Sequence, residues 1–390
     1  MKNNNTGQPT IIYFGNDWSA DNKTSSHHIA MRLLRDHRLI YIECPGLRAP
    51  QTSKRDIGKI FKKMFKVLSG AKRIKGDSYV YTLFQIPFHR FSLIQKLNKK
   101  LIIWQCRNIC RKYNINKPIL WFVVPHVAMV LGKLNEGMSV YYCVDDYVEL
   151  PGVNKTMIRE MDGRMTSECN LVFVTSEPLF KQKKKYARKI ILSKHGVDFE
   201  HFNSVYKKEN MIPQEISTIG KPVIGFFGLI ETWVDLDLIH YLATERPDWK
   251  FLMIGRSAID ISSCNELDNV YFIGSKTYDE LPSYAQVFDV ALIPCKANEL
   301  IRNFNPLKLR EYLAMGVPVV SVYFPEIEEF RGLVRIADKY DDFLAEIKSL
   351  LEMDYSDEAV RGIKLVEPLS WENRYKNVKE AVYKELEEIS

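Results

Sequence analysis

The sequence lacks a run of apolar residues long enough to cross a bilayer. Its longest such run, "PILWFVVPHVAMVL" at 118–131, is too short for a transmembrane helix and is interrupted by Pro125 and His126. We interpret it as a buried strand followed by its exit loop. The first ten residues, "MKNNNTGQPT", are polar and lack the apolar centre of a signal peptide, so we expect no secretory leader.

Cysteine is scarce and scattered. The chain has seven cysteines, an odd number, and no Cys-x-x-Cys pair. Cys106 and Cys110 lie one helical turn apart, which is only a weak indication of a metal site. Reduced and buried thiols in a cytoplasmic protein are the better interpretation.

Two common nucleotide-binding motifs are also missing. No G-x-G-x-x-G follows the apolar stretches that end near Phe14 and Phe227, which argues against a nicotinamide-dependent dehydrogenase. No G-x-x-x-x-G-K-[ST] loop is present, which argues against a P-loop enzyme. Asp235 and Asp237 have the spacing of an Asp-x-Asp metal motif, but they lie in an amphipathic, helix-like stretch. We therefore expect no essential metal ion.

Positive charge is concentrated in one part of the chain. Residues 51–120 contain 17 Lys or Arg against two acidic residues, Asp56 and Asp77, whereas the whole chain has a formal charge of only +7. So uneven a distribution favours an anionic partner. The segment lacks the signatures of nucleic-acid-binding modules, and nucleic acid is not expected as a partner.

Part of this basic region has the pattern of a surface helix. In "IGKIFKKMFKVL", at 57–68, apolar residues recur at helical spacing with lysines between them. An apolar stripe beside a lysine face suits an anionic membrane surface, and we predict such a contact through residues 54–75. The alternative is a helix docked on its own domain with a solvated lysine face.

Strand-like and helix-like stretches alternate along the whole chain, which predicts α/β structure with parallel, doubly wound sheets. Ser25 or Ser26 is expected to cap the first helix. The rhythm restarts after an irregular stretch near 203–220. We therefore predict two Rossmann-like domains facing a cleft, at 1–205 and 206–370, with a C-terminal helix at 371–390 crossing back to the first.

The stretch "NFNPLKLREYLAMGVPVVS", at 303–321, carries the most specific pattern. Asn305 is a good helix cap and Pro306 suits a first helical position. Free amides at a helix start attract an anion, and Lys308 can donate to the same anion. Glu311 lies on the same face, roughly 5–6 Å away between Cβ atoms, where a carboxylate could accept bonds from ribose hydroxyls. A surface Lys–Glu pair is the alternative.

This stretch resembles the nucleotide-sugar motif of two-domain, GT-B-type glycosyltransferases of the bacterial cell-surface and exopolysaccharide kind. In the large retaining branch two glutamates flank seven residues; Glu311 matches the second, which binds the ribose, and Asn303 replaces the first. The stretch also resembles inverting exopolysaccharide glucuronosyltransferases, in which a lysine at the position of Lys308 binds the diphosphate. The resemblance implies a nucleotide-sugar co-substrate, and no other cofactor is expected.

Further candidates come from the ends of predicted strands. Free amides near Gly228 could help to bind the diphosphate, Arg256 is a substitute phosphate contact, and Glu231 is a second carboxylate near the donor. Asp145 and Asp146 end the strand of "VYYCVDD", where their mutual repulsion would raise one pKa and suit a general base; Asp146 is slightly favoured, and a turn cap is the alternative.

Three histidines are candidate acceptor contacts: His27, His28 and His126. We predict a transferase that moves a sugar from a nucleotide diphosphate, UDP being favoured, to a lipid-linked or growing cell-surface polysaccharide at the inner face of the cell membrane. The alternatives are another enzyme on the same fold, such as a nucleotide-sugar epimerase or a phosphorylase, and a non-catalytic nucleotide-binding subunit of a polysaccharide assembly complex.

Overall fold

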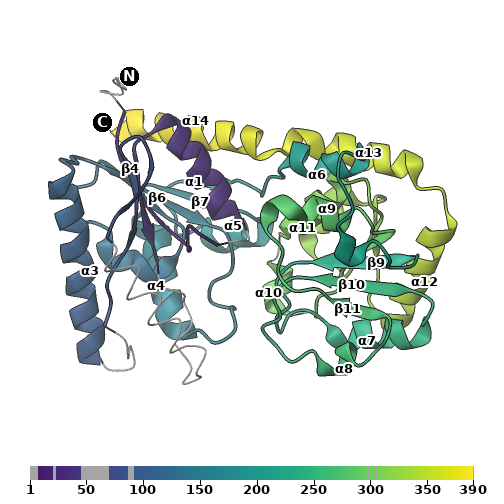
Figure 1. Ribbon diagram of the computed structural model, residues 1–390. Coiled ribbons are helices and arrows are strands. Elements are labelled where there is room, and N and C mark those ends of the chain that lie inside the picture. The colour runs from purple at the N-terminus through teal and green to yellow at the C-terminus, as the bar shows by residue number, and fades with distance from the viewer. Residues whose placement is uncertain are drawn as a thin grey trace. The chain divides into compact units, whose positions relative to one another are not determined.

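The computed structural model describes residues 8–20, 23–44, 70–86, 92–296, 298–303 and 305–389. Residues 54–69 of the predicted membrane-binding segment lie outside these ranges. The chain forms two compact units, Met1–Ser193 with Tyr375–Ser390 and Lys194–Arg374 (Figure 1). The division falls before the predicted boundary at 205, because helix α6 (Phe199–Tyr206) packs on helices of the second unit.

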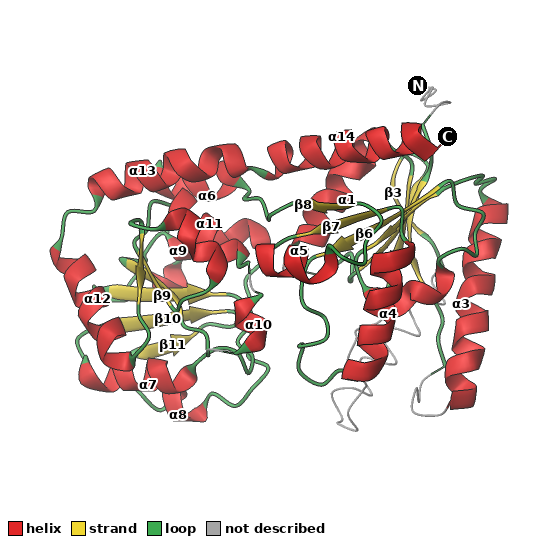
Figure 2. Ribbon diagram, turned by 180° about the vertical axis from the view of Figure 1, so that it is seen from behind, coloured by secondary structure: helices red, strands yellow, loops and turns green. Residues whose placement is uncertain are grey.

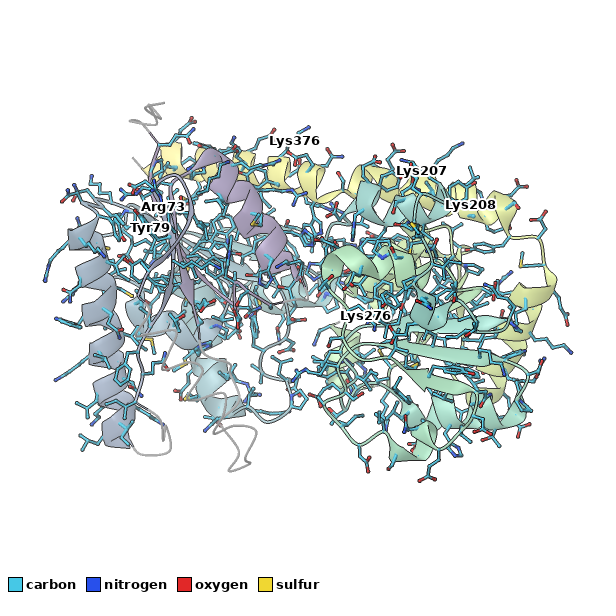
Figure 3. The ribbon with its side chains drawn as sticks, viewed as in Figure 1. Arg73, Tyr79, Lys207, Lys208, Lys276 and Lys376 are labelled. Atoms are coloured by element: carbon cyan, nitrogen blue, oxygen red, sulfur yellow. The ribbon has the colours of Figure 1, made fainter. Side chains whose placement is uncertain are left out.

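A mostly parallel sheet forms the centre of the first unit. Its described strands have the order β3-β4-β2-β1-β5-β6-β7-β8, and only β3 runs antiparallel to its neighbour. Arg73 of β3 lies opposite Tyr79 of β4, and both are labelled in Figure 3. The strands are β1 (Ile11–Gly15), β2 (Leu39–Glu43), β3 (Lys72–Lys75), β4 (Ser78–Thr82), β5 (Ile119–Phe122), β6 (Met138–Cys143), β7 (Leu171–Val174) and β8 (Ile190–Leu192).

The two faces of this sheet have different partners. Alternate residues of the strands, such as Phe14 and Phe122, pack with α3, η1 and α4. The other face carries a row of stacked aromatic rings, including Tyr13 and Trp121 with centroids 6.0 Å apart; the Tyr13 hydroxyl donates to the α1 carbonyl of Ser26 across 2.8 Å. The helices are α1 (Ser25–Asp36), α3 (Ser92–Lys112), η1 (Pro125–Val130), α4 (Lys155–Glu168) and α5 (Glu177–Lys183).

The second unit has an entirely parallel sheet of the order β11-β10-β9-β12-β13-β14 (Figure 2). The chain adds β10 and β11 on one side of β9 and then β12–β14 on the other, which is the doubly wound pattern. Side chains alternate between two cores: Phe227 packs with α6, α9 and α11, and Phe226 with α7 and α12. The strands are β9 (Val223–Phe227), β10 (Lys250–Ile254), β11 (Val270–Phe272), β12 (Val290–Ile293), β13 (Val319–Ser321) and β14 (Val334–Ile336).

Helices cover both faces of this second sheet, as doubly wound topology requires. They are α7 (Leu236–Glu245), α8 (Ser262–Asn265), α9 (Leu281–Ala285), α10 (Glu299–Arg302), α11 (Leu307–Ala314), α12 (Tyr340–Glu352) and α13 (Ser356–Val366), with the short helices η2 (Gln214–Ile216), η3 (Tyr278–Glu280), η4 (Pro325–Phe330) and η5 (Glu367–Leu369). The predicted α/β fold of two doubly wound units is confirmed.

The last helix, α14 (Trp371–Ile389), is shared between the units. Its first residues, through Arg374, belong to the second unit, and its residues from Tyr375 onward belong to the first. Asp36 at the end of α1 accepts from the Tyr375 hydroxyl across 2.8 Å and pairs with Lys379 at 2.7 Å. None of the helices described is long and apolar enough to cross a bilayer.

Candidate functional site

Bare backbone lies at the carboxyl ends of β9 and β10. Gly228 and Gly255 follow these strands with φ values of +139° and +147°, a region that side chains rarely tolerate. A Cβ on Gly255 would lie 1.8 Å from the Gly228 carbonyl oxygen. The two strand exits therefore approach each other more closely than any other residue type permits.

Lys308 occupies the space above Gly228. It is the second residue of α11, and its Nζ would be 2.9 Å from a Cβ on Gly228 and is 4.5 Å from the ring centroid of Phe226. Burial lowers the pKa of the Lys308 ammonium, an effect that Cys295 and Glu311 oppose. No carboxylate of the described residues lies within ion-pair distance of this ammonium. A half-buried cation without a carboxylate partner among these residues is suited to an anionic ligand, whereas the Gly228 amide, which the sequence predicted to be free, donates to the Ile254 carbonyl across 2.8 Å.

Glu311 lies one turn further along the same helix and is 8% exposed. Burial raises the pKa of its carboxyl from 4.5 to about 8, although Lys308 opposes the shift. In the described part of the chain no group makes a hydrogen bond to this carboxyl. Lys308, Glu311 and Gly228, predicted as donor contacts from separate motifs, are therefore close to one another in one unit.

The predicted role of Asn305 as a helix cap is wrong. Pro306 is the N-cap of α11, which begins at Leu307. The Asn305 side chain instead accepts a hydrogen bond from Nη1 of Arg310 across 2.5 Å. Arg310 is fully buried and its Nη2 lies 3.7 Å from Glu329, so the arginine draws Asn305 inward and away from the free amides of the helix.

The other predicted donor contacts have different surroundings. The Asn303 side chain donates to the Glu299 carbonyl across 3.3 Å, at the end of α10. Glu231 is 4% exposed and accepts from the amide of Thr232 across 3.0 Å. The Arg256 side chain is exposed, while its carbonyl accepts from the amide of Ile230. Of these three side chains, Arg256 is the one that is exposed and positively charged, as a phosphate contact requires.

The paired carboxylates of the first unit follow β6. Asp146 is 7% exposed and accepts from the amide of Val148 across 3.3 Å, the geometry of a turn. Burial raises its pKa, and the Val148 hydrogen bond opposes that shift. Burial, with a smaller contribution from Asp146, raises the pKa of Asp145 to about 7. The Asp145 carboxyl accepts no hydrogen bond from any residue that the structure describes. Its environment therefore suits a general base better than that of Asp146.

The histidines near α1 are largely structural. Thr24, rather than Ser25 or Ser26, is the N-cap of α1. The Thr24 amide donates to Nδ1 of His27 across 3.2 Å, while Nε2 donates to the Asp17 carbonyl across 2.8 Å. Both ring nitrogens are thus used within the fold, and burial lowers the pKa of His27. His28 is also buried and His126 half-buried.

The two aspartates of the Asp-x-Asp spacing have partners within the fold. Asp235 caps α7 by accepting from the Leu238 amide across 3.2 Å, and it also accepts from the Tyr340 hydroxyl. Asp237 lies 3.6 Å from the ammonium of Lys296. The described residues contain no cluster of three or more His, Cys, Asp or Glu side chains that could hold a metal ion.

Sequence reasoning missed the residues that hold α11 in place. Tyr312 accepts from the Phe227 amide across 3.1 Å, which joins the helix to the end of β9. Lys194 pairs with Glu326 at 2.8 Å and also with Glu329, the partner of Arg310. The sequence indicates these contacts only through Arg310, a charged residue among the apolar residues of α11. The pattern does not show which residue pairs with this arginine.

The second unit is similar to a known family of proteins. Residues 221–353, which include β9–β14 and α11, match the family described as "Glycosyl transferases group 1". The chain is 26% identical over 230 residues to a protein of Bacillus subtilis (strain 168) described as the teichuronic acid biosynthesis glycosyltransferase TuaH. That match covers 54% of this chain and 57% of the relative, so the chain spans little more than half the length of the curated relative it matches.

Solved structures of low sequence identity share the whole fold. Sucrose-phosphate synthase from Thermosynechococcus elongatus is 14% identical, with a TM-score of 0.72 and coverage of 98% of this chain and all of that one. HepE from Anabaena, solved with UDP and glucose, is 13% identical, with a TM-score of 0.69 over 97% of this chain and all of that one. The predicted resemblance to GT-B-type glycosyltransferases is confirmed.

Proposed function

We propose that this protein is a glycosyltransferase that moves a sugar from UDP to a lipid-linked or growing polysaccharide acceptor in cell-surface glycan synthesis. The observation that carries the proposal is the grouping of Lys308, Glu311 and Gly228 at the carboxyl end of a doubly wound sheet. The TuaH likeness supports a cell-surface glycan, and the likeness to HepE, solved with UDP, supports the nucleotide.

The proposal assigns donor binding to the second unit. The ammonium of Lys308 and the amides at the start of α11 would bind the diphosphate beside Gly228, and they would stabilise the negative charge that develops as the sugar–phosphate bond breaks. The carboxyl of Glu311, which keeps its proton up to about pH 8, would accept a hydrogen bond from one ribose hydroxyl and donate one to the other. The exposed guanidinium of Arg256 is retained as a second phosphate contact, and no metal ion is required for these roles.

Acceptor activation is assigned to the first unit. An acceptor hydroxyl attacks the anomeric carbon, the bond from that carbon to the diphosphate oxygen breaks, and the hydroxyl proton passes to a base. UDP and the glycoside leave as products. The Asp145 carboxyl, with its pKa of about 7, is the better base, because Asp146 already accepts a backbone hydrogen bond.

Transfer of radiolabel from each common nucleotide sugar to a membrane extract tests the proposal. We expect label in lipid or polymer with a UDP-sugar, and loss of transfer in Lys308→Ala. Isomerised free nucleotide sugar would instead indicate an epimerase, and nucleotide binding without turnover would indicate a binding subunit. Silence with every UDP-, GDP-, ADP- and CMP-linked sugar would overturn the proposed activity.

A further inference from the structure

Helix α3 exposes a second apolar stripe in addition to the one it buries. Its inner face, with Ile102, Cys106 and Ile109, packs in the core of the first unit. Leu93 and Trp104 are nevertheless 68% and 58% exposed. Both ribbon views show α3 at the margin of the first unit, with the sheet on one side of it only (Figures 1 and 2).

The exposed residues fall on one line of the helix. At 100° per residue, Leu97, Lys100, Trp104 and Arg107 lie within about 40° of Leu93, opposite the buried stripe. Leu97 is itself 46% exposed. We call the residues Leu93, Leu97, Lys100, Trp104, Arg107 and Arg111 the α3 outer face; it extends for roughly 27 Å along the helix.

A further exposed ring lies beside the middle of this face. Phe84 is 40% exposed, and its backbone is joined to α3 by two hydrogen bonds of 2.9 Å, one to and one from the side chain of Gln105. Gln105 directly follows Trp104 in the helix. The apolar surface is therefore not confined to isolated side chains along one helix.

The charged residues of α3 all carry the same sign. Helix α3 contains six Lys or Arg residues and no Asp or Glu. None of these six side chains forms an ion pair with another residue of the described ranges. Their long apolar stems can lie along the leucines while their charged ends extend outward. The face thus combines exposed apolar groups with cations that form no ion pair in the part of the chain that the structure describes.

We infer that the α3 outer face docks on an anionic lipid bilayer. Tryptophan with leucine flanked by lysine and arginine matches the boundary between acyl chains and anionic headgroups, where an indole ring and basic side chains both find partners. The inference assigns a surface to the membrane contact that the sequence predicted. It rests on the proposed function only for the identity of the acceptor. Vesicle binding is measured without nucleotide sugar, so either idea can fail alone.

Co-sedimentation of the full chain with vesicles tests the inference. We expect binding to phosphatidylcholine vesicles that contain phosphatidylglycerol, weaker binding to pure phosphatidylcholine, and loss of the difference at high salt. Lys96→Glu with Lys100→Glu should lower partitioning about 25-fold or more, since each basic residue near an anionic surface contributes roughly fivefold. Lys348→Glu with Lys364→Glu, two exposed lysines of the second unit, is the matched control.

The apolar part of the face is tested by Leu93→Ser with Leu97→Ser and Trp104→Ser, which should lower partitioning about tenfold or more on both vesicle types. Quenching of tryptophan fluorescence by brominated lipid reports directly on contact between the α3 outer face and the bilayer, because Trp104 is the one exposed tryptophan of the six. Of the other five, two are half-buried and three are buried: Trp18 and Trp233, and Trp121, Trp249 and Trp371. Quenching should disappear in Trp104→Phe. Unchanged vesicle binding in the variants, or wild-type self-association that the triple variant abolishes, would overturn the inference.

Discussion

Arg310 donates a hydrogen bond to Asn305 across 2.5 Å, and both side chains are almost completely buried. The arginine lies on the inner side of α11, whereas Lys308 and Glu311 are the candidate ligand-binding groups of the same helix. Asn305 precedes that helix and is held by it. The loop before α11 is therefore fixed by a residue from within the helix.

Arg310→Met and Asn305→Ala should each lower the local stability of α11. We expect about 3 kcal/mol for the arginine, because its loss leaves buried polar partners unsatisfied, and about 1–3 kcal/mol for the asparagine. The double variant should cost less than the sum by roughly 0.5–3 kcal/mol, because the residues act as a pair. Native-state hydrogen exchange of the α11 amides measures these values; strict additivity would contradict a direct pair.

Lys308→Ala should raise the dissociation constant for UDP about tenfold to hundredfold, because hydrogen bonds to charged groups contribute about 1.5–3 kcal/mol each. A thermal-shift screen with UDP, GDP, ADP and CMP measures it, since a ligand that binds the folded state raises its apparent stability. UDP should give the largest shift. Lys348→Ala, an exposed lysine on α12, is the control and should behave as the wild type; equal shifts in both variants would refute the role of Lys308.

Glu311→Gln should change how stability depends on pH. The folded-state pKa of Glu311 is about 8, above its ordinary value of 4.5, so between these values the folded protein holds a proton that the unfolded chain has released. This contribution to stability is present below the lower value and is lost as pH rises through the upper one. Unfolding measured from about pH 5 to about pH 8 should show a smaller decline in the variant; parallel profiles would contradict this protonation state.

Asp145→Asn should lower the rate of sugar transfer by about 10²–10⁴ while leaving UDP affinity unchanged, because a general base acts in the chemical step. A base must be deprotonated, so wild-type kcat/KM should rise with pH through about 7. That rise should be absent in Asp145→Asn and present in Asp146→Asn. The opposite outcome for the two variants would assign the base to Asp146, as the sequence alone slightly favoured.

Much of the fold could be predicted from the sequence because its strands are short apolar runs and most of its helices have a single apolar face. The apolar run at 118–131, interpreted as a buried strand and its exit loop, contains β5 followed by the short helix η1. Helix α3 was missed. Its apolar residues lie on two opposite faces, so the sequence lacks the single apolar stripe that predicts an amphipathic helix. Its lysines predict a charged surface but no particular element.

The site was predictable only in part. The spacing of Lys308 and Glu311, three residues apart, places them on one helical face whatever the exact helix start. The cap predicted at Asn305 was wrong because its side-chain oxygen can accept either from a helix amide or from another side chain. In the structure it accepts from the buried guanidinium of Arg310. Similarly, Thr24 rather than Ser25 caps α1 because His27 completes the reciprocal bonding with it. Such outcomes depend on tertiary contacts that spacing does not encode.

The shared helix α14 has a consequence for dissecting the protein. No single cut yields both units intact, since a fragment that stops at Ser193 lacks Tyr375 and Lys379 and leaves Asp36 without its two partners. A fragment of 194–374 would end one turn into a helix. For crystallography or calorimetry, the proposed donor-binding unit should therefore be expressed with the whole of α14. The apolar residues of α14 that belong to the first unit would then be exposed, and they should be replaced by polar ones.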